Sequence, residues 1–226
     1  GLGLVNTFMA VPYDAAGPTT RPTTCVTPAN SRTDLLMIPD TAMQTTAEEI
    51  GSLLSMLYYC AKGGGALMAV YPGEVTAQEC RAILGLMVLN EEGNLIRFGV
   101  PENVPVSHKH GWDLVTHGDA GIVFSPGGDY VIVEYLSLGA GNTGNWLDHE
   151  ISFPILREIS RAVYNYFNYE NPNLEDPIDR SLREAAVREA AAPASAQAAE
   201  EQPGAEATAV PDPNATPDPP AAQTNN

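Results

Sequence analysis

Two stretches of the chain place hydrophobic residues at helical spacing directly after a helix-capping signal. Thr46 and Glu49 have the spacing of a capping box, and apolar residues follow at positions 50, 53, 54 and 57. The glycines at 63–65 can close that helix, because glycine adopts the left-handed backbone conformation freely. A second box, Thr76 with Glu79, precedes apolar positions 83, 84, 87 and 88. The pattern predicts helices over residues 46–61 and 76–89.

Three short apolar runs in the middle of the chain have the character of strands. They cover residues 104–112, 118–124 and 130–136, and a Ser-Pro-Gly-Gly-Asp turn joins the last two in a way that suits an antiparallel hairpin. The last two runs are apolar on both faces, which indicates a sheet covered by helices on two sides. Apolar positions from 155 to 167 predict a final amphipathic helix, with Pro154 in its first turn. We therefore expect an α+β fold, an antiparallel sheet flanked by helices.

The two ends of the chain lack this periodicity. Residues 1–44 are rich in Pro, Thr, Gly and Asn, which predicts ordered loop or disorder for most of this stretch. Residues 169–226 are dominated by Ala, Pro, Glu, Gln and Thr, so that little apolar surface is present to offset chain entropy. The expected organisation is one structured domain over residues 1–168 and a disordered acidic tail over 169–226, with a transient helix over 180–192.

The charge balance narrows the range of partners. The formal net charge is −17, and no cluster of Lys and Arg is present, which disfavours nucleic acid and anionic membrane surfaces. No apolar run approaches the roughly 20 residues that span a bilayer, so no transmembrane segment is expected. The chain begins Gly-Leu-Gly-Leu, without Met or a leader, which is compatible with the loss of an upstream signal region.

Three cysteines are present, at positions 25, 60 and 80, and their odd number leaves at least one unpaired within the chain. Cys60 ends the first predicted helix and Cys80 lies near the start of the second, so antiparallel packing of these helices would allow a disulfide. The alternative is that these are buried free thiols.

The stretch richest in candidate functional residues is Val-Ser-His-Lys-His-Gly-Trp at 106–112. Lys109, one of only two lysines, stands between two histidines and before Gly111, where a ligand could approach the backbone closely. One alternative is that Lys109 is a solvated charge on an edge strand. Another is a zinc site formed by nearby His and Asp side chains, namely His108, His110, His117 and Asp119.

The order of elements around Lys109-His110-Gly111 resembles the C-terminal half of class A β-lactamases and the related penicillin-binding proteins, a superfamily of serine hydrolases. In that family the triplet is Lys-Thr-Gly or Lys-Ser-Gly, followed by a hairpin and a closing helix. The resemblance covers roughly residues 1–168 and is most specific over 106–136.

The resemblance implies acyl transfer to a serine from a β-lactam or from the D-Ala-D-Ala end of a peptidoglycan peptide, with no metal or other cofactor. Lys109 would hold the ligand carboxylate, and His110 would stand in for the usual hydroxyl beside it. Gly111 would make room for the ligand, and the backbone N–H of Trp112 would be one oxyanion-hole donor. The location implied is extracytoplasmic.

The sequence departs from the family pattern at the nucleophile. A Ser-x-x-Lys motif requires serine three residues before a lysine, and those positions hold Tyr59 and Val106. The only match to the second motif, at 166–168, lies on the final helix, and only Asp14 stands in the region of the deacylating glutamate. The simplest interpretation is an N-terminally truncated enzyme that is inactive by itself. The rival hypothesis is a non-catalytic cell-envelope module that keeps the fold for binding.

Overall fold

The computed structural model describes residues 1–10, 25–34, 43–90, 95–112, 116–137 and 147–191, except the side chains at 147–151 and 189–191. Its contacts divide the chain into two units, Gly1–Glu184 and Ala185–Asn226. The first unit contains the sheet and the elements around it.

The predicted sheet is confirmed. Strands β3 (Val106–Trp112), β4 (Thr116–Val123) and β5 (Tyr130–Ser137) are antiparallel and lie in the order β3-β4-β5. Side chains alternate between the two faces of each strand, so the register decides which groups meet. On one face it sets His110 opposite Asp119 and Asp119 opposite Glu134. Ionisable groups thus cross this face in a row.

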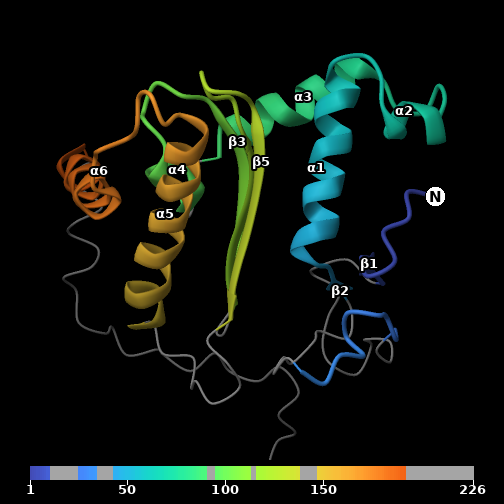
Figure 1. The fold of residues 1–226 in the computed structure, drawn as a ribbon, viewed down its shortest axis with the longest axis horizontal. Coiled ribbons are helices and arrows are strands. Elements are labelled where there is room, and N and C mark those ends of the chain that lie inside the picture. The colour runs from blue at the N-terminus through green and yellow to red at the C-terminus, as the bar shows by residue number, and fades with distance from the viewer. Residues whose placement is uncertain (11–24, 35–42, 91–94, 113–115, 138–146, 192–226) are drawn as a thin grey trace, which may run out of the picture. The chain divides into compact units, whose positions relative to one another are not determined.

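Helices cover both faces of the sheet, as the two-sided apolar pattern predicts (Figure 1). Helices α1 (Ala47–Ala61) and α3 (Ala77–Val88) pack on one face, and the short α2 (Ala66–Val70) lies between them in the sequence. Helices α4 (Leu95–Gly99) and α5 (Leu147–Phe167) pack on the other. The core of the first face is centred on Leu54, Leu84 and Ile122. That of the second is larger and includes Ile96, Val100, Val104, Val106, Val123, Tyr130, Ile132 and Tyr164.

The two predicted capping boxes differ in the structure. In α3 the box is complete: the Thr76 hydroxyl accepts from the Glu79 N–H at 3.3 Å, and the Glu79 carboxylate accepts from the Thr76 N–H at 2.9 Å. In α1 only the Thr46 half forms, with the hydroxyl accepting from the Glu49 N–H at 3.2 Å. The Glu49 carboxylate points elsewhere.

Glu49 anchors the beginning of the chain on α1. Its carboxylate accepts hydrogen bonds from the Asn6 N–H at 2.9 Å and from the Thr7 hydroxyl at 2.5 Å. Burial alone would raise the pKa of Glu49, but the hydrogen bonds from Thr7 and Asn6 outweigh it and lower the pKa. This segment also contributes strand β1 (Phe8–Met9), which pairs antiparallel with β2 (Met43–Gln44).

The disulfide that the sequence left open is formed between Cys60 and Cys80. Both residues are buried, at 0% and 1% exposure, and join the end of α1 to the start of α3. Cys25 is free and exposed.

Replacing both cysteines, Cys60→Ala with Cys80→Ala, is expected to lower the free energy of unfolding by about 3 kcal/mol, because the bond closes a loop of moderate length in the unfolded chain. The sequence separation of the two cysteines is 20 residues. Urea denaturation measures the change, and Cys25→Ala serves as the control, since its thiol is exposed. Equal stability of the double variant and the original chain would contradict a structural role for the bond.

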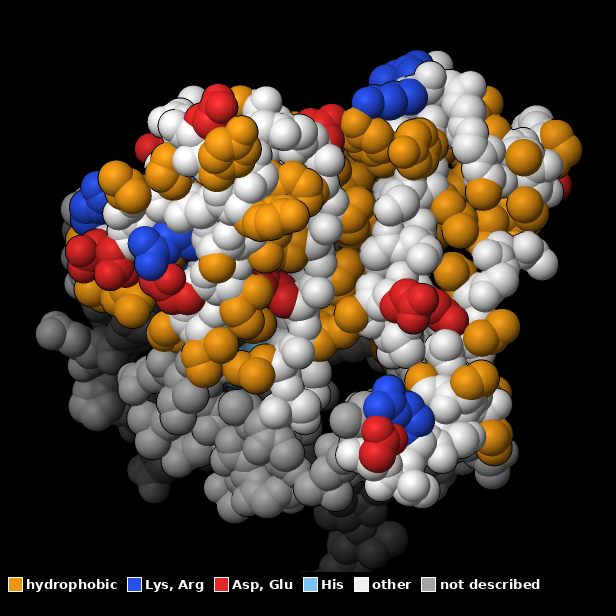
Figure 2. All heavy atoms as spheres, viewed as in Figure 1, with side chains coloured by type: hydrophobic (Ala, Val, Ile, Leu, Met, Phe, Trp, Pro, Cys, Tyr) orange, Lys and Arg blue, Asp and Glu red, His pale blue; other side chains and the backbone are white. Residues whose placement is uncertain are grey.

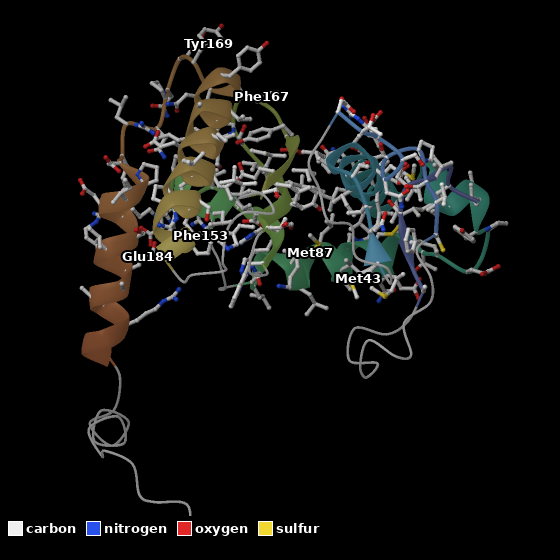
Figure 3. All side chains as sticks on the ribbon, turned by 90° about the horizontal axis from the view of Figure 1, so that it is seen from below. Met43, Met87, Phe153, Phe167, Tyr169 and Glu184 are labelled. Carbon is white, nitrogen blue, oxygen red and sulfur yellow. A yellow bond between two sulfur atoms is a disulfide. The ribbon has the colours of Figure 1, made fainter. Side chains whose placement is uncertain are left out.

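The final helix begins earlier than its sequence predicts. Pro154 lies inside α5 and not in its first turn, so that part of the expectation is wrong. Proline lacks the N–H for one helical hydrogen bond, a cost that the rest of a long helix can offset. The buried side chains of α5 include Leu156, Ser160 and Tyr164, and Figure 3 shows the helix between Phe153 and Phe167 beside the sheet. Beyond its end, Asn168 holds the β4–β5 turn, accepting from the Gly127 N–H at 2.8 Å.

Helix α6 (Pro177–Ala191) starts three residues before the helix expected at 180–192. Within the first unit its Arg180 is only 4% exposed, and its guanidinium donates to the carbonyl oxygens of Arg97 and Val100. A hydrophobicity count misses this docking, because the contact is made by a charged side chain to backbone oxygens. The remainder of the tail, 192–226, lies outside the described residues.

Candidate functional site

Strand β3 presents its alternate residues to two different environments. The Ser107 hydroxyl donates to the Leu84 carbonyl oxygen of α3 at 2.8 Å, which places the odd-numbered residues of the strand on the side of α3. By alternation Lys109 and Gly111 belong to the same side. The even-numbered residues project toward α4 and α5.

Lys109 and Gly111 form the open part of the strand. The Lys109 side chain is exposed, and its ammonium donates to the carbonyl oxygen of His110 at 2.7 Å. A Cβ built on Gly111 would meet no atom within 4 Å, so the backbone here is accessible. Trp112 follows and is 45% exposed. An ammonium group beside an accessible extended backbone can hold a carboxylate while a ligand lies along the strand.

His110 lies on the other face of the strand from Lys109. Its side chain is 6% exposed, and its backbone is opposite Asp119. The sequence suggested a contact between His110 and a ligand carboxylate, and this contact stays a prediction. In this chain the side chains of His110 and Lys109 lie on opposite faces of the strand.

On the opposite face of the sheet from Lys109, His108 of β3 is hydrogen-bonded to Asp119 of β4. His108 Nδ1 lies 3.0 Å from both carboxylate oxygens of Asp119, and the two side chains are 1% and 0% exposed. Asp119 also accepts from the backbone N–H of Ile96 at 3.1 Å and from that of Ala120 at 3.0 Å. A carboxylate with this many donors is well satisfied in spite of its burial.

Glu134 is the least satisfied ionisable group of this face. It lies opposite Asp119 and is 6% exposed, and neither of its carboxyl oxygens has a hydrogen-bond partner within the described part of the chain. Burial, and secondly the neighbouring charge of Asp119, raises the pKa of Glu134 to about 9. Glu134 is therefore a neutral acid at pH 7.

A serine and a histidine also meet on this face. His117 Nδ1 is hydrogen-bonded to the Ser152 hydroxyl of α5, and the His117 ring packs edge-on against Phe153 with centroids 5.2 Å apart. Ser152 is 0% and His117 1% exposed. A Ser–His pair can act as an activated nucleophile, but this one is sealed from substrate and joins α5 to β4.

An open groove runs between α1 and the face of β5. Its volume is about 620 Å³, and its lining includes Gly51, Ser52, Ser55, Met56, Tyr59, Val131 and Val133. A Cβ on Gly51 would be in ordinary van der Waals contact with the Val133 side chain, at 3.7 Å. Figure 2 shows hydrophobic side chains gathered along the boundary between the sheet and α1. Among the described residues that line the groove, no cluster of catalytic groups is present.

The described residues contain neither a metal-binding cluster nor a membrane-spanning helix. Within the described ranges, no group of three or more His, Cys, Asp or Glu side chains is arranged to hold a metal ion. The zinc site considered from the sequence therefore has no ligand cluster among the described residues. His108 is hydrogen-bonded to Asp119, and His117 to Ser152. None of the helices in the described part of the chain is long and apolar enough to cross a membrane.

The structure brings together some of the residues that the sequence singled out, and adds one. Lys109, Gly111 and Trp112 are neighbours on β3, while His110 is turned away. Asp14, which stands in the region where the family has its deacylating glutamate, lies outside the described residues. The sequence analysis did not single out Glu134, although its position was informative. An acidic residue in a strand that is covered on both faces is either buried or at the edge of the covered surface.

A family model and several solved structures match this chain. A family model described as the β-lactamase enzyme family matches residues 19–167. No match was found among curated proteins. Among solved structures, the chain is similar to a protein called PBP-A, with 18% identity and a TM-score of 0.43 over 59% of this chain and 46% of the other.

Two similar structures are β-lactamases. One, from Sphaerobacter thermophilus, has 17% identity and a TM-score of 0.43, covering 61% of this chain and 46% of the other. The other, a class A enzyme from Mycobacterium abscessus, has 18% identity and a TM-score of 0.43, covering 64% and 48%. The chain thus spans a little under half the length of these structures.

Proposed function

The chain belongs to the β-lactamase enzyme family, and on this premise we propose that it is the C-terminal part of a serine hydrolase that forms an acyl-enzyme with a β-lactam or a D-Ala-D-Ala peptide. The observation that carries the proposal is the exposed Lys109 beside the accessible backbone of Gly111, on a strand within the matched region.

Each group of this strand has a distinct role in the proposed reaction. The Lys109 ammonium attracts the ligand carboxylate, and Gly111 lets the ligand lie along β3. The backbone N–H of Trp112 donates to the oxyanion that forms when a serine attacks the carbonyl carbon. Serine adds to the carbonyl, the amide nitrogen leaves with a proton, and water then hydrolyses the resulting ester.

The serine of this reaction is proposed to come from a segment upstream of Gly1. No serine of this chain stands three residues before a lysine, since Tyr59 and Val106 hold those positions. Ser107 and Ser125, the serines nearest the strand and its hairpin, are 0% and 6% exposed. The open groove between α1 and β5 is compatible with a missing segment packed against this half of the fold.

The protein is also proposed to work outside the cytoplasm. The Cys60–Cys80 disulfide supports this location, because such bonds persist in oxidising compartments.

A fluorescent penicillin tests the proposed function. We expect residues 1–226 alone to form no covalent adduct, and the longer protein to form one adduct per molecule, both measured by intact mass. An adduct on residues 1–226 would show that a serine of this chain is the nucleophile. A longer protein that carries Ser-x-x-Lys and is never labelled would contradict the enzyme and favour the envelope binding module.

A further inference from the structure

The chain contains a buried hydrogen-bonded pair, His108 and Asp119, on the face of the sheet opposite to Lys109. His108 is the neighbour of Lys109 on β3, and Asp119 lies across from it on β4. His108 Nδ1 is 3.0 Å from each oxygen of the Asp119 carboxylate, and both side chains are almost fully enclosed. The backbone between His108 and Lys109 is one peptide unit. Whatever fixes the imidazole therefore limits where the lysine side chain can point.

Asp119 connects this pair to elements on the α4–α5 side of the sheet. Its carboxylate accepts from the Ile96 N–H at the start of α4, at 3.1 Å. The carbonyl oxygen of Ile96 accepts in turn from the Ser160 hydroxyl of α5 at 2.8 Å. Strands β3 and β4 and helices α4 and α5 are thus joined through a continuous set of hydrogen bonds.

Gly121 makes the position of His108 possible. The two residues are opposite each other in the β3–β4 register, and a Cβ on Gly121 would lie 2.7 Å from the His108 Cβ. The missing side chain leaves the space in which the imidazole turns toward Asp119. The histidine is thus both hydrogen-bonded and enclosed, and it has little freedom to change rotamer.

We propose that His108 and Asp119 are positioning residues for the carboxylate-binding lysine. The pair contacts no ligand itself, because it is enclosed between the sheet and α4 and α5. It fixes the position and rotation of β3 relative to β4 and α4. Lys109 and Gly111 then face the ligand from the opposite face of the sheet. This inference rests on the proposed function of Lys109 and concerns how that group is held.

Two reporters separate positioning from general stability. A fluorescent penicillin with a free carboxylate needs Lys109, whereas its methyl ester has no carboxylate for the lysine to hold. In the longer protein, His108→Leu is expected to lower the acylation rate by the acid roughly tenfold or more, the scale of a small misplacement of a reacting group. The rate with the ester should stay within about twofold. His108→Asn should recover most of the loss, because its amide N–H can replace the Nδ1–H donor.

A matched control is Asn168→Ala, which removes a similarly buried polar side chain, 6% exposed, from the β4–β5 turn. It should leave the ratio of acid to ester rates unchanged. If His108→Leu lowers both rates equally, the pair is merely structural and the inference is wrong.

Hydrogen exchange on residues 1–226 provides a test that does not depend on acylation. The backbone amides of 109–112 should exchange faster in His108→Leu than in the original chain, while those of 131–134 on β5 should not. Unchanged exchange at 109–112 would overturn the positioning role. Absence of labelling in the original longer protein, by contrast, would overturn the proposed function and leave the exchange result to decide on the pair.

Discussion

In the longer protein that supplies the nucleophile, Lys109→Ala is expected to lower the rate of acylation by a fluorescent penicillin by about a hundredfold or more, the scale of a lost charge contact in the transition state. Lys109 is exposed and lies near Gly111, a backbone position at which a Cβ meets nothing within 4 Å. A carboxylate held there would lose its cation in the variant. The measurement is the second-order rate constant of labelling.

The chain provides its own control for the lysine. Lys62 is the only other lysine, and it is also exposed. It lies at the end of α1, where it is hydrogen-bonded to the Tyr58 hydroxyl and sits 4.0 Å from the Tyr58 ring centroid. Lys62→Ala should leave the labelling rate within about twofold. Equal rates for Lys109→Ala and the original protein would show that Lys109 does not take part.

Local patterns were sufficient to predict the elements that pack around the sheet. The Thr46 and Thr76 caps, with apolar residues at helical spacing after them, located α1 and α3 to within about a residue of their observed starts. Two-sided apolar strands predicted the layers, because each buried face has to be covered. These signals work because they depend on neighbours within one or two turns of chain.

Long-range polar contacts were not predictable in the same way. The Glu49 carboxylate completes no capping box, since it binds Asn6 and Thr7 far away in the sequence. The pairing of Cys60 with Cys80 requires two helices to meet, and the sequence by itself favoured buried free thiols. Such contacts depend on the tertiary arrangement, which residue spacing alone does not specify.

The sequence motif singled out Lys109 and Gly111 as candidates, but it did not indicate the positioning role that we propose for His108 and Asp119. Lys109 and Gly111 stand on the open face of β3, as a strand motif predicts by alternation. The same alternation sends His108, Asp119 and Glu134 to the enclosed face, and it can be read from the sequence once the register is known. Without the register, a zinc site formed by the histidines around Lys109 stayed an alternative.

Glu134 gives the stability of the chain a specific pH dependence. Its folded-state pKa is raised to about 9, chiefly by burial and secondly by the charge of Asp119. In the unfolded chain the group titrates near its ordinary value of about 4.3. Between these two values the folded state binds one more proton than the unfolded state, so this contribution to stability is fully present below the lower pKa and is lost as pH rises toward the upper one.

Glu134→Gln is expected to remove this loss and to raise the free energy of unfolding at pH 8 by on the order of 4 kcal/mol, since the amide has nearly the shape of the neutral acid and does not ionise. Urea denaturation of residues 1–226 at pH 5 and pH 8 measures the effect. The original chain should be clearly weaker at pH 8, and the variant should change far less. Glu74→Gln, at an exposed position, is the matched control and should follow the original chain at both values. If Glu134→Gln shows the same decline between pH 5 and pH 8 as the original chain, Glu134 is not the group that carries it.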